Sequence, residues 1–339
     1  GVTVTLTATP ANSLASIIIS QNYNSGNDTR LLLNTSGTTL TCSSLSMTDN
    51  DRNNNVELEI SDGTLQVNGS ASFTRTTSNN RSRYVRLNIH TTGRMNVTSN
   101  LNYTYGRANN SGDGANEVQI SNDGILNIDG NLNCTVGNNN GTSNEFRFQM
   151  NDNAVCNVLG NVTLTLGNST DGDDLIYDIN GGNFTVTGTF SAAVNNTCNN
   201  SNALSMFIDG GSVSTGAFSF TQNGGGTQGD MSLFLNQSST AVAASLTVTG
   251  DLSFSHSDGD NMEIETNANA TLSVSGTLAT SITSSADGDN LILDFNGGTV
   301  NAASITSILA TGATSANNLQ WTVDGTTVNV TGDLYISVG

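Results

Sequence analysis

The sequence predicts an all-β protein, a parallel β-helix (β-solenoid) of about eleven coils of ~29 residues with three short strands each. Two observations predict this fold. Short segments that alternate apolar and polar residues occur along the whole chain, and the same strand–turn–strand design returns at a nearly constant interval. Alternation with a period of two is typical of strands that bury one face, because successive side chains point to opposite faces. No helical period of apolar residues persists for three turns.

The design is clearest from Leu175 to Phe190, LIYDINGGNFTVTGTF. Two alternating segments flank Asn180-Gly181-Gly182, and these residue types favour a turn because they tolerate positive φ. Further copies lie at residues 56–73, 118–132, 206–220 and 291–305. A design that recurs this often defines the fold.

The spacing of the repeats sets the domain organisation. The first strands of successive units open at Leu31, Val56, Val85, Glu117, Glu145, Leu175, Leu204, Met231, Met262, Leu291 and Leu319, which are 25 to 32 residues apart. We expect a single β-solenoid over 1–339, with a divergent first coil at 1–30, regular coils at 31–318 and an incomplete last coil at 319–339. A propeller blade needs four strands, and a β-sandwich would not repeat at this interval.

Each unit carries three strands in a fixed order. The first, such as VELEI at 56–60, precedes an Asn/Asp-Gly turn, and the second ends in glycine. The third follows directly and leads into a polar loop. Because equivalent side chains stack in a solenoid, the turn residues are expected to form a hydrogen-bonded column. These residues are Asp62, Asp123, Asn180, Asp209, Asn296 and Asp324.

The charge distribution is asymmetric. The formal net charge is −19, the chain has no lysine, and all nine arginines lie between Arg30 and Arg147. Seventeen acidic residues and no Lys or Arg follow residue 147. This excess of carboxylates argues against nucleic acid or an anionic membrane as partner. No apolar run approaches the ~20 residues that would span a bilayer, so no membrane insertion is expected.

The cysteines and histidines predict neither a disulfide framework nor a zinc site. Cys42, Cys134 and Cys156 fall within strand patterns, where a thiol behaves as a small apolar side chain, and Cys198 lies in a polar loop. None of the four forms a C-x-x-C pair. The two histidines are far apart in the sequence.

Acidic loops close several units and offer a candidate calcium site. Oxygen-rich clusters suit Ca²⁺, but the loops match no known calcium motif, and Asp and Gly are also ordinary turn residues. Solvated turns are therefore favoured, with calcium as the alternative and no cofactor required. The candidate ligands are Asp171, Asp173, Asp174, Asp258, Asp260, Asp287 and Asp289.

No constellation indicates catalysis. The best candidate places Arg81, Arg83 and Arg86 one coil away from Glu57 and Glu59. Ion pairing between neighbouring strands explains this arrangement equally well. The sequence contains no G-x-S-x-G element and no phosphate-binding loop. We therefore expect a protein that is not an enzyme.

The repeat [Asn/Asp]-Gly-Gly-x-φ-x-Val-x-Gly-x-φ, where φ is apolar, resembles the β-helical repeats of large bacterial surface proteins. These include autotransporter passengers, filamentous adhesins and the secreted adhesins of Bacteroidota. The resemblance covers nearly the whole chain, but any β-helix needs glycine at its corners. It implies secretion, exposure on the cell surface, and a structural role in a filament, appendage or adhesin stalk. The alternative is a calcium-dependent or carbohydrate-binding adhesin, and a polysaccharide-degrading enzyme is least favoured.

The two ends of the chain predict the partner. The chain opens on the apolar strand VTVTLTA and stops on LYISVG, and neither end shows a polar cap. An uncapped solenoid edge is free to pair with further strands. We expect an internal segment of a longer polypeptide or a filament subunit, which associates with neighbouring segments or with itself through the solenoid ends.

Overall fold

The computed structural model describes residues 2–8, 10, 12–21, 29–49, 55–75, 83–105, 116–136, 144–166, 174–194, 202–222, 229–238, 241–256, 261–283, 290–310 and 318–339. These residues form strands, turns and bends, and none of them is helical. Accordingly, this part of the chain contains no helix that could cross a membrane.

The strands follow one another without interruption by any other element in the described residues. In chain order they are β1 (Val2–Leu6), β2 (Ile17–Gln21), β3 (Thr29–Cys42), β4 (Leu45–Asp49), β5 (Val56–Val67), β6 (Ala71–Arg75), β7 (Arg83–Val97), β8 (Leu101–Tyr105), β9 (Asn116–Asn122), β10 (Ile125–Ile128), β11 (Leu132–Val136), β12 (Asn144–Val158), β13 (Val162–Leu166), β14 (Asp174–Val194), β15 (Asn202–Ile208), β16 (Gly211–Gln222), β17 (Gly229–Leu235), β18 (Ala244–Val248), β19 (Leu252–His256), β20 (Asn261–Thr266), β21 (Ala270–Ile282), β22 (Asn290–Phe295), β23 (Thr299–Leu309), β24 (Asn318–Val323), β25 (Thr327–Val330) and β26 (Leu334–Val338).

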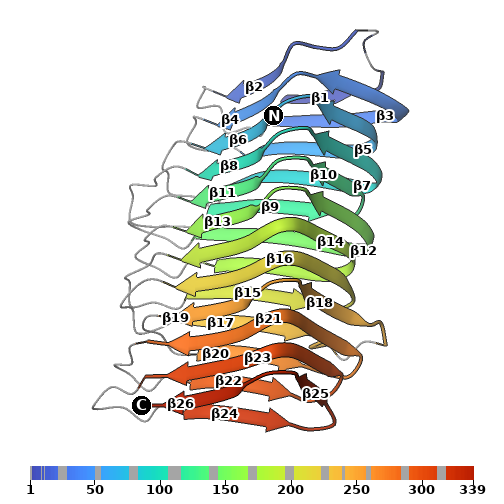
Figure 1. Cartoon of the computed structure of the whole chain (residues 1–339). Helices are drawn as coiled ribbons and strands as arrows, with labels where there is room; N and C mark the ends of the chain where they lie inside the picture. Colours follow the sequence, from blue (N-terminus) through green and yellow to red (C-terminus); the bar gives the residue numbers. More distant parts are fainter. Residues whose placement is uncertain are drawn as a thin grey trace.

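The described strands stack as the coils of a parallel β-solenoid (Figure 1). Sheet 1 contains the first strand of each coil, in the order β1, β3, β5, β7, β9, β12, β14, β15, β17, β20, β22 and β24. Each strand pairs in parallel with its equivalent about 29 residues away, which confirms the predicted fold class. The coil count differs slightly from the expected eleven.

Two further parallel sheets complete each coil. Sheet 2 contains the second strands, among them β10, β18, β25 and the middle of β14. Sheet 3 contains the third strands, from β2 and β4 to β26. Long strands bend through the corners and belong to more than one sheet: β14 alone runs through all three. With strands ~4.8 Å apart, the stack is a rod roughly 50 Å long.

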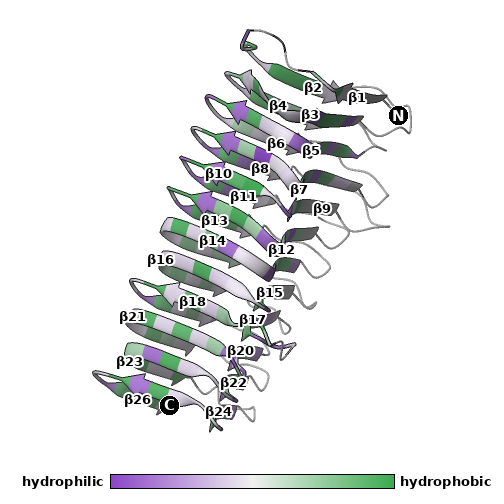
Figure 2. Ribbon diagram, turned by 90° about the vertical axis from the view of Figure 1, so that its right-hand side faces the viewer, coloured by the Kyte–Doolittle hydropathy of each residue, from purple (hydrophilic) through white to green (hydrophobic). Residues whose placement is uncertain are grey.

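Alternation along each strand separates core from surface. In β21 the residues are alternately buried and partly exposed, and Figure 2 shows apolar and polar residues alternating along the strands. The inward side chains form columns that continue from coil to coil. The central column of sheet 1 is Leu58, Leu87, Ile120, Phe148, Tyr177, Met206, Leu233, Ile264 and Leu293, all fully buried. Burial of these columns is the main stabilising contribution.

Aromatic side chains fill the middle of the rod. Tyr177 on sheet 1 packs against Phe148 of the preceding coil and Phe190 on sheet 3, with ring centroids 5.3 and 5.0 Å apart. Phe190 in turn stacks on Phe218 of the next coil at 4.9 Å and 3°. These contacts join consecutive coils and two of the three sheets.

The corner between sheets 1 and 2 only partly matches the predicted column of turn residues. Gly182 adopts a φ of 75°, which explains why glycine stands there. The Asn151 amide donates to Asp123 Oδ1 at 2.8 Å, and the Asn180 amide donates to Asn151 Oδ1 at 3.5 Å. Asp209, however, accepts from a hydroxyl of a neighbouring turn, that of Ser238. The hydrogen-bonded column at this corner is therefore short.

Glycines form most of the corner between sheets 2 and 3. Gly160, Gly188 and Gly276 each donate a backbone hydrogen bond to the glycine of the preceding coil, at 2.9 to 3.0 Å. A Cβ atom at Gly188 would lie 2.8 Å from the carbonyl oxygen of Gly160. At these glycines the backbones stack closely, which accounts for the glycine that usually ends the second strand, although Ser99 and Ala303 occupy the equivalent position in two other coils.

Candidate functional site

The predicted calcium ligands lie almost entirely outside the described residues. Of the seven, the structure describes only Asp174, the first residue of β14, which pairs in register with Glu145 and Ala203 of the adjacent coils. Within the described residues, no three His, Cys, Asp or Glu side chains come together as a metal would need. The calcium site in the loops stays a prediction.

The predicted arginine–glutamate cluster is partly brought together. Glu57 and Glu59 lie on the outer face of sheet 1, and Arg86 Nη1 is 4.0 Å from Glu57 Oε1. Arg81 lies outside the described residues, as does the side chain of Arg83.

Residues that the sequence analysis did not include complete this cluster. Arg30 Nε lies 3.3 Å from Glu57 Oε2, and the Arg30 guanidinium also contacts Glu59. Asn88 Nδ2 donates to Glu57 Oε1 at 2.6 Å, and His90 Nε2 lies 3.1 Å from Glu59 Oε1. Both carboxylates therefore have several polar partners on adjacent coils. The arrangement is that of a network of ion pairs and hydrogen bonds linking neighbouring strands.

The buried cysteines behave as apolar residues. Cys42, Cys134 and Cys156 are free thiols in the core, as the strand pattern predicts, and Cys198 lies outside the described residues. Burial raises the pKa of the Cys134 and Cys156 thiols far above the ordinary value, so both stay protonated. Protonated thiols are poor nucleophiles and poor metal ligands.

A hollow of about 400 Å³ opens on the outer face of sheet 2, over the coils from β5 to β14. One side is formed by outward side chains of the second strands, including Asn96, Asn127 and Asn157. The other side is formed by corner residues such as Thr98 and Leu159. A second hollow, of about 270 Å³, opens on the same side of the rod over β21, β23 and β25.

The amides along the first hollow are hydrogen-bonded to one another in series. Asn127 Nδ2 donates to Asn96 Oδ1 at 2.8 Å, and Asn157 Nδ2 donates to Asn127 Oδ1 at 2.9 Å. Asn96 itself donates to Gln66 Oε1 at 3.0 Å. The series spans four coils and holds each amide in a fixed orientation.

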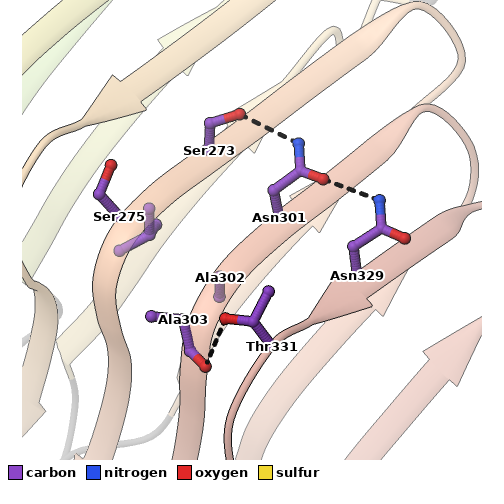
Figure 3. A pocket seen from close by; sticks show the side chains of 8 residues that line it. Ser273, Ser275, Asn301, Ala302, Ala303, Asn329 and Thr331 are labelled. Atoms are coloured by element: carbon purple, nitrogen blue, oxygen red, sulfur yellow. Dashed lines mark hydrogen bonds between the residues drawn. The ribbon is translucent and has the colours of Figure 1, made fainter.

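The second hollow repeats this arrangement (Figure 3). Asn329 Nδ2 donates to Asn301 Oδ1 at 2.8 Å, and Asn301 Nδ2 donates to Ser273 Oγ at 3.2 Å. On the corner side, the Thr331 hydroxyl lies 3.5 Å from the carbonyl oxygen of Ala303. No charged side chain lines this hollow among the described residues.

One column of polar residues connects the two hollows. Its members occupy the same outward position of the second strand and pair in register across successive coils. We call them the polar column: Gln66, Asn96, Asn127, Asn157, Thr185, Ser214, Thr247, Ser273, Asn301 and Asn329. We call these two hollows, which lie along the polar column and follow it parallel to the rod axis, the sheet 2 groove.

Unused hydrogen-bonding capacity remains along the polar column. An amide carries two N–H donors and an oxygen with two lone pairs, and the series uses one donor and one lone pair of Asn127. The groove therefore presents an amide donor and an acceptor at successive coils in its asparagine-lined stretches. Among the described lining residues, Asp129 is the only charged one.

The repeat pattern does not predict this groove, although the sequence contains a signal of it. Asn96, Asn127 and Asn157 occupy the same position of three successive second strands, in the tripeptides MNV, LNI and CNV. The expected hydrogen-bonded column was assigned to the turn instead. Recurrence alone does not reveal that a column borders a hollow, since this depends on the angle between sheet 2 and its corner.

The fold and the two hollows define the chain as a β-solenoid repeat protein with a largely uncharged, polar groove on one sheet. Comparisons with models of known protein families, with curated proteins and with solved structures find no match for it. The class therefore follows from the repeat geometry alone.

Proposed function

We propose that the protein is a structural segment of an extracellular filament, appendage or adhesin stalk on a bacterial cell surface. The observation that carries this proposal is the stacking of equivalent strands in register along the whole rod. Such a stack is stiff and extends by adding coils, because each coil contacts only its neighbours. The resemblance of the repeat to bacterial surface proteins supports the location, and the proposed role requires no catalysis.

The last coil supports association through the ends. Leu334 and Val338 of β26 pair with Ile305 and Leu309, which are buried in the preceding coil. Their own exposed fractions are 54% and 55%, because no described coil covers them. We propose that a further solenoid coil, from a second copy or a neighbouring segment, covers this apolar end face.

The end face can be tested by charge substitution. Leu334→Asp with Val338→Asp is expected to abolish concentration-dependent elongation, measured by sedimentation velocity and negative-stain microscopy, because the carboxylates would be buried between coils. Tyr335→Asp is the matched control, since Tyr335 pairs with Thr306, on the outer face of sheet 3. A chain that stays monomeric at every concentration, or an equal effect of the control, would contradict end-to-end association.

Calcium binding by the acidic loops remains the alternative proposal. Its support is the recurrence of Asp-Gly-Asp at residues 171–173, 258–260 and 287–289. Isothermal titration with Ca²⁺, with and without chelator, tests it directly. If Ca²⁺ produces no heat of binding and no change in the thermal stability of the protein, calcium binding is contradicted.

A further inference from the structure

We propose that the sheet 2 groove binds a linear, uncharged polysaccharide lying parallel to the rod axis. This inference goes beyond the structural role and does not depend on association through the ends. It rests on the length of the polar column, on the chemistry of the residues that line the two hollows and on the direction of the strands beneath them.

The extent of the polar column points to a polymer. The polar column has ten members from Gln66 to Asn329, and with coils ~4.8 Å apart it extends roughly 40 Å. The two hollows, of about 400 and 270 Å³, lie over different parts of this column. A ligand with equivalent groups at regular intervals can contact several coils at once, and its affinity then increases with the number of units.

The lining points to neutral hydroxyl groups. The amides of Asn127 and its neighbours are held in series and keep a donor and an acceptor each, which suits a group that both donates and accepts. Sugar hydroxyls have this property. The corner side adds the hydroxyls of Thr98 and Thr187 and the apolar side chain of Leu159, which is 58% exposed. Among the described residues that line the two hollows, Asp129 is the only charged group that an ionic ligand would meet.

The direction of the strands argues against an extended peptide. A peptide that adds a strand needs a free edge with unpaired N–H and C=O groups. Along the groove, each inner strand of sheet 2 is paired on both sides, as β10 is with β7 and β12. The groove crosses these strands and offers side chains only.

Binding is tested with the intact chain and a panel of soluble neutral polysaccharides: dextran, mannan, xyloglucan and a β-1,3-glucan. Affinity electrophoresis identifies the polymer, and calorimetry with oligosaccharides of increasing length measures its affinity. We expect one class of polymer to bind, with affinity that rises with chain length.

Two variants place a bulky side chain in the groove. Thr187→Arg and Leu159→Arg are each expected to weaken binding at least about tenfold, which corresponds to ~1.4 kcal/mol. Thr104→Arg is the matched control, because Thr104 is an exposed threonine on the outer face of sheet 3. Circular dichroism establishes that all three variants fold.

The proposal would be overturned if none of the neutral polymers bound, or if Thr104→Arg weakened polysaccharide binding as much as the two groove variants. A preference for an anionic polysaccharide or an extended peptide over the neutral panel would also overturn it. Because sedimentation and microscopy report on elongation separately, loss of polysaccharide binding leaves the structural role untouched.

Discussion

Glu263 shows how stacking changes the properties of a single residue. It lies on the outer face of sheet 1 in β20, partly buried, with Glu265, Asp294 and Asp230 nearby. Burial, followed by the repulsion from these three carboxylates, raises the pKa of Glu263 above its ordinary value of 4.5. No Lys or Arg follows residue 147 in the sequence to offset this repulsion.

The raised pKa predicts how stability depends on pH. The native state binds more protons than the unfolded state above pH 4.5, so the free energy of unfolding falls as pH rises through the native pKa of Glu263. Glu263→Gln is therefore expected to stabilise the protein at pH 7, by less than about 1 kcal/mol because the site is partly solvated. Below pH 4.5 the difference should vanish.

Urea unfolding at pH 7 and pH 4 measures this effect. A stability difference that is the same at both pH values would mean that the substitution acts through packing rather than through charge.

At the scale of the element, the amide series of sheet 2 stabilises the contacts between coils. Asn127 takes part in two of its hydrogen bonds, one to Asn96 and one from Asn157. A net contribution of roughly 0.5–1.5 kcal/mol per hydrogen bond is typical. The series therefore contributes to stability as well as lining the groove.

Asn127→Leu is expected to lower the free energy of unfolding by about 1–3 kcal/mol, because both hydrogen bonds are lost. Chemical denaturation followed by circular dichroism measures the change. Thr104→Val provides the control: its hydroxyl points outward from sheet 3, so the effect should stay within about 0.5 kcal/mol. A loss of similar size in both variants would argue against a stabilising role of the series.

At the scale of the whole molecule, the protection of backbone amides from hydrogen exchange should decrease from the middle of the rod to its ends. Tyr177 is fully buried and packs against aromatic rings of its own and the preceding coil. Trp321 in the last coil is only partly buried and has a ring contact with Phe295 at 6.0 Å. In repeat proteins each coil is stabilised by its neighbours, so a terminal coil lacks one of its two interfaces.

Hydrogen exchange followed by mass spectrometry tests this gradient. Amides of β12 and β14 are expected to exchange most slowly, and those of β24 to β26 fastest. The gradient at the C-terminal end should disappear under conditions in which the chain elongates, because a further coil then covers the end. Equal protection of the amides in all coils of a monomer would contradict the idea that each coil is stabilised by its two neighbours.

The sequence predicted the class of fold because its strongest signals are local and repeated. The period-two alternation of β21, the Asn180-Gly181-Gly182 turn and the glycine at most of the second corners follow from strand and turn geometry alone. Their recurrence every 29 residues or so then required coils to stack.

What the sequence determined by itself is therefore the solenoid, its parallel strands and the burial of Cys42, Cys134 and Cys156, since each depends on residues close together in the chain. The tertiary structure determined which side chains of different coils lie next to one another. It showed that Glu57 pairs with Arg30 as well as Arg86, and that the asparagines of the second strand border a groove. The physical reason is that a local pattern fixes which way a side chain points, whereas the neighbours of that side chain depend on the register between coils and on the angles at the corners.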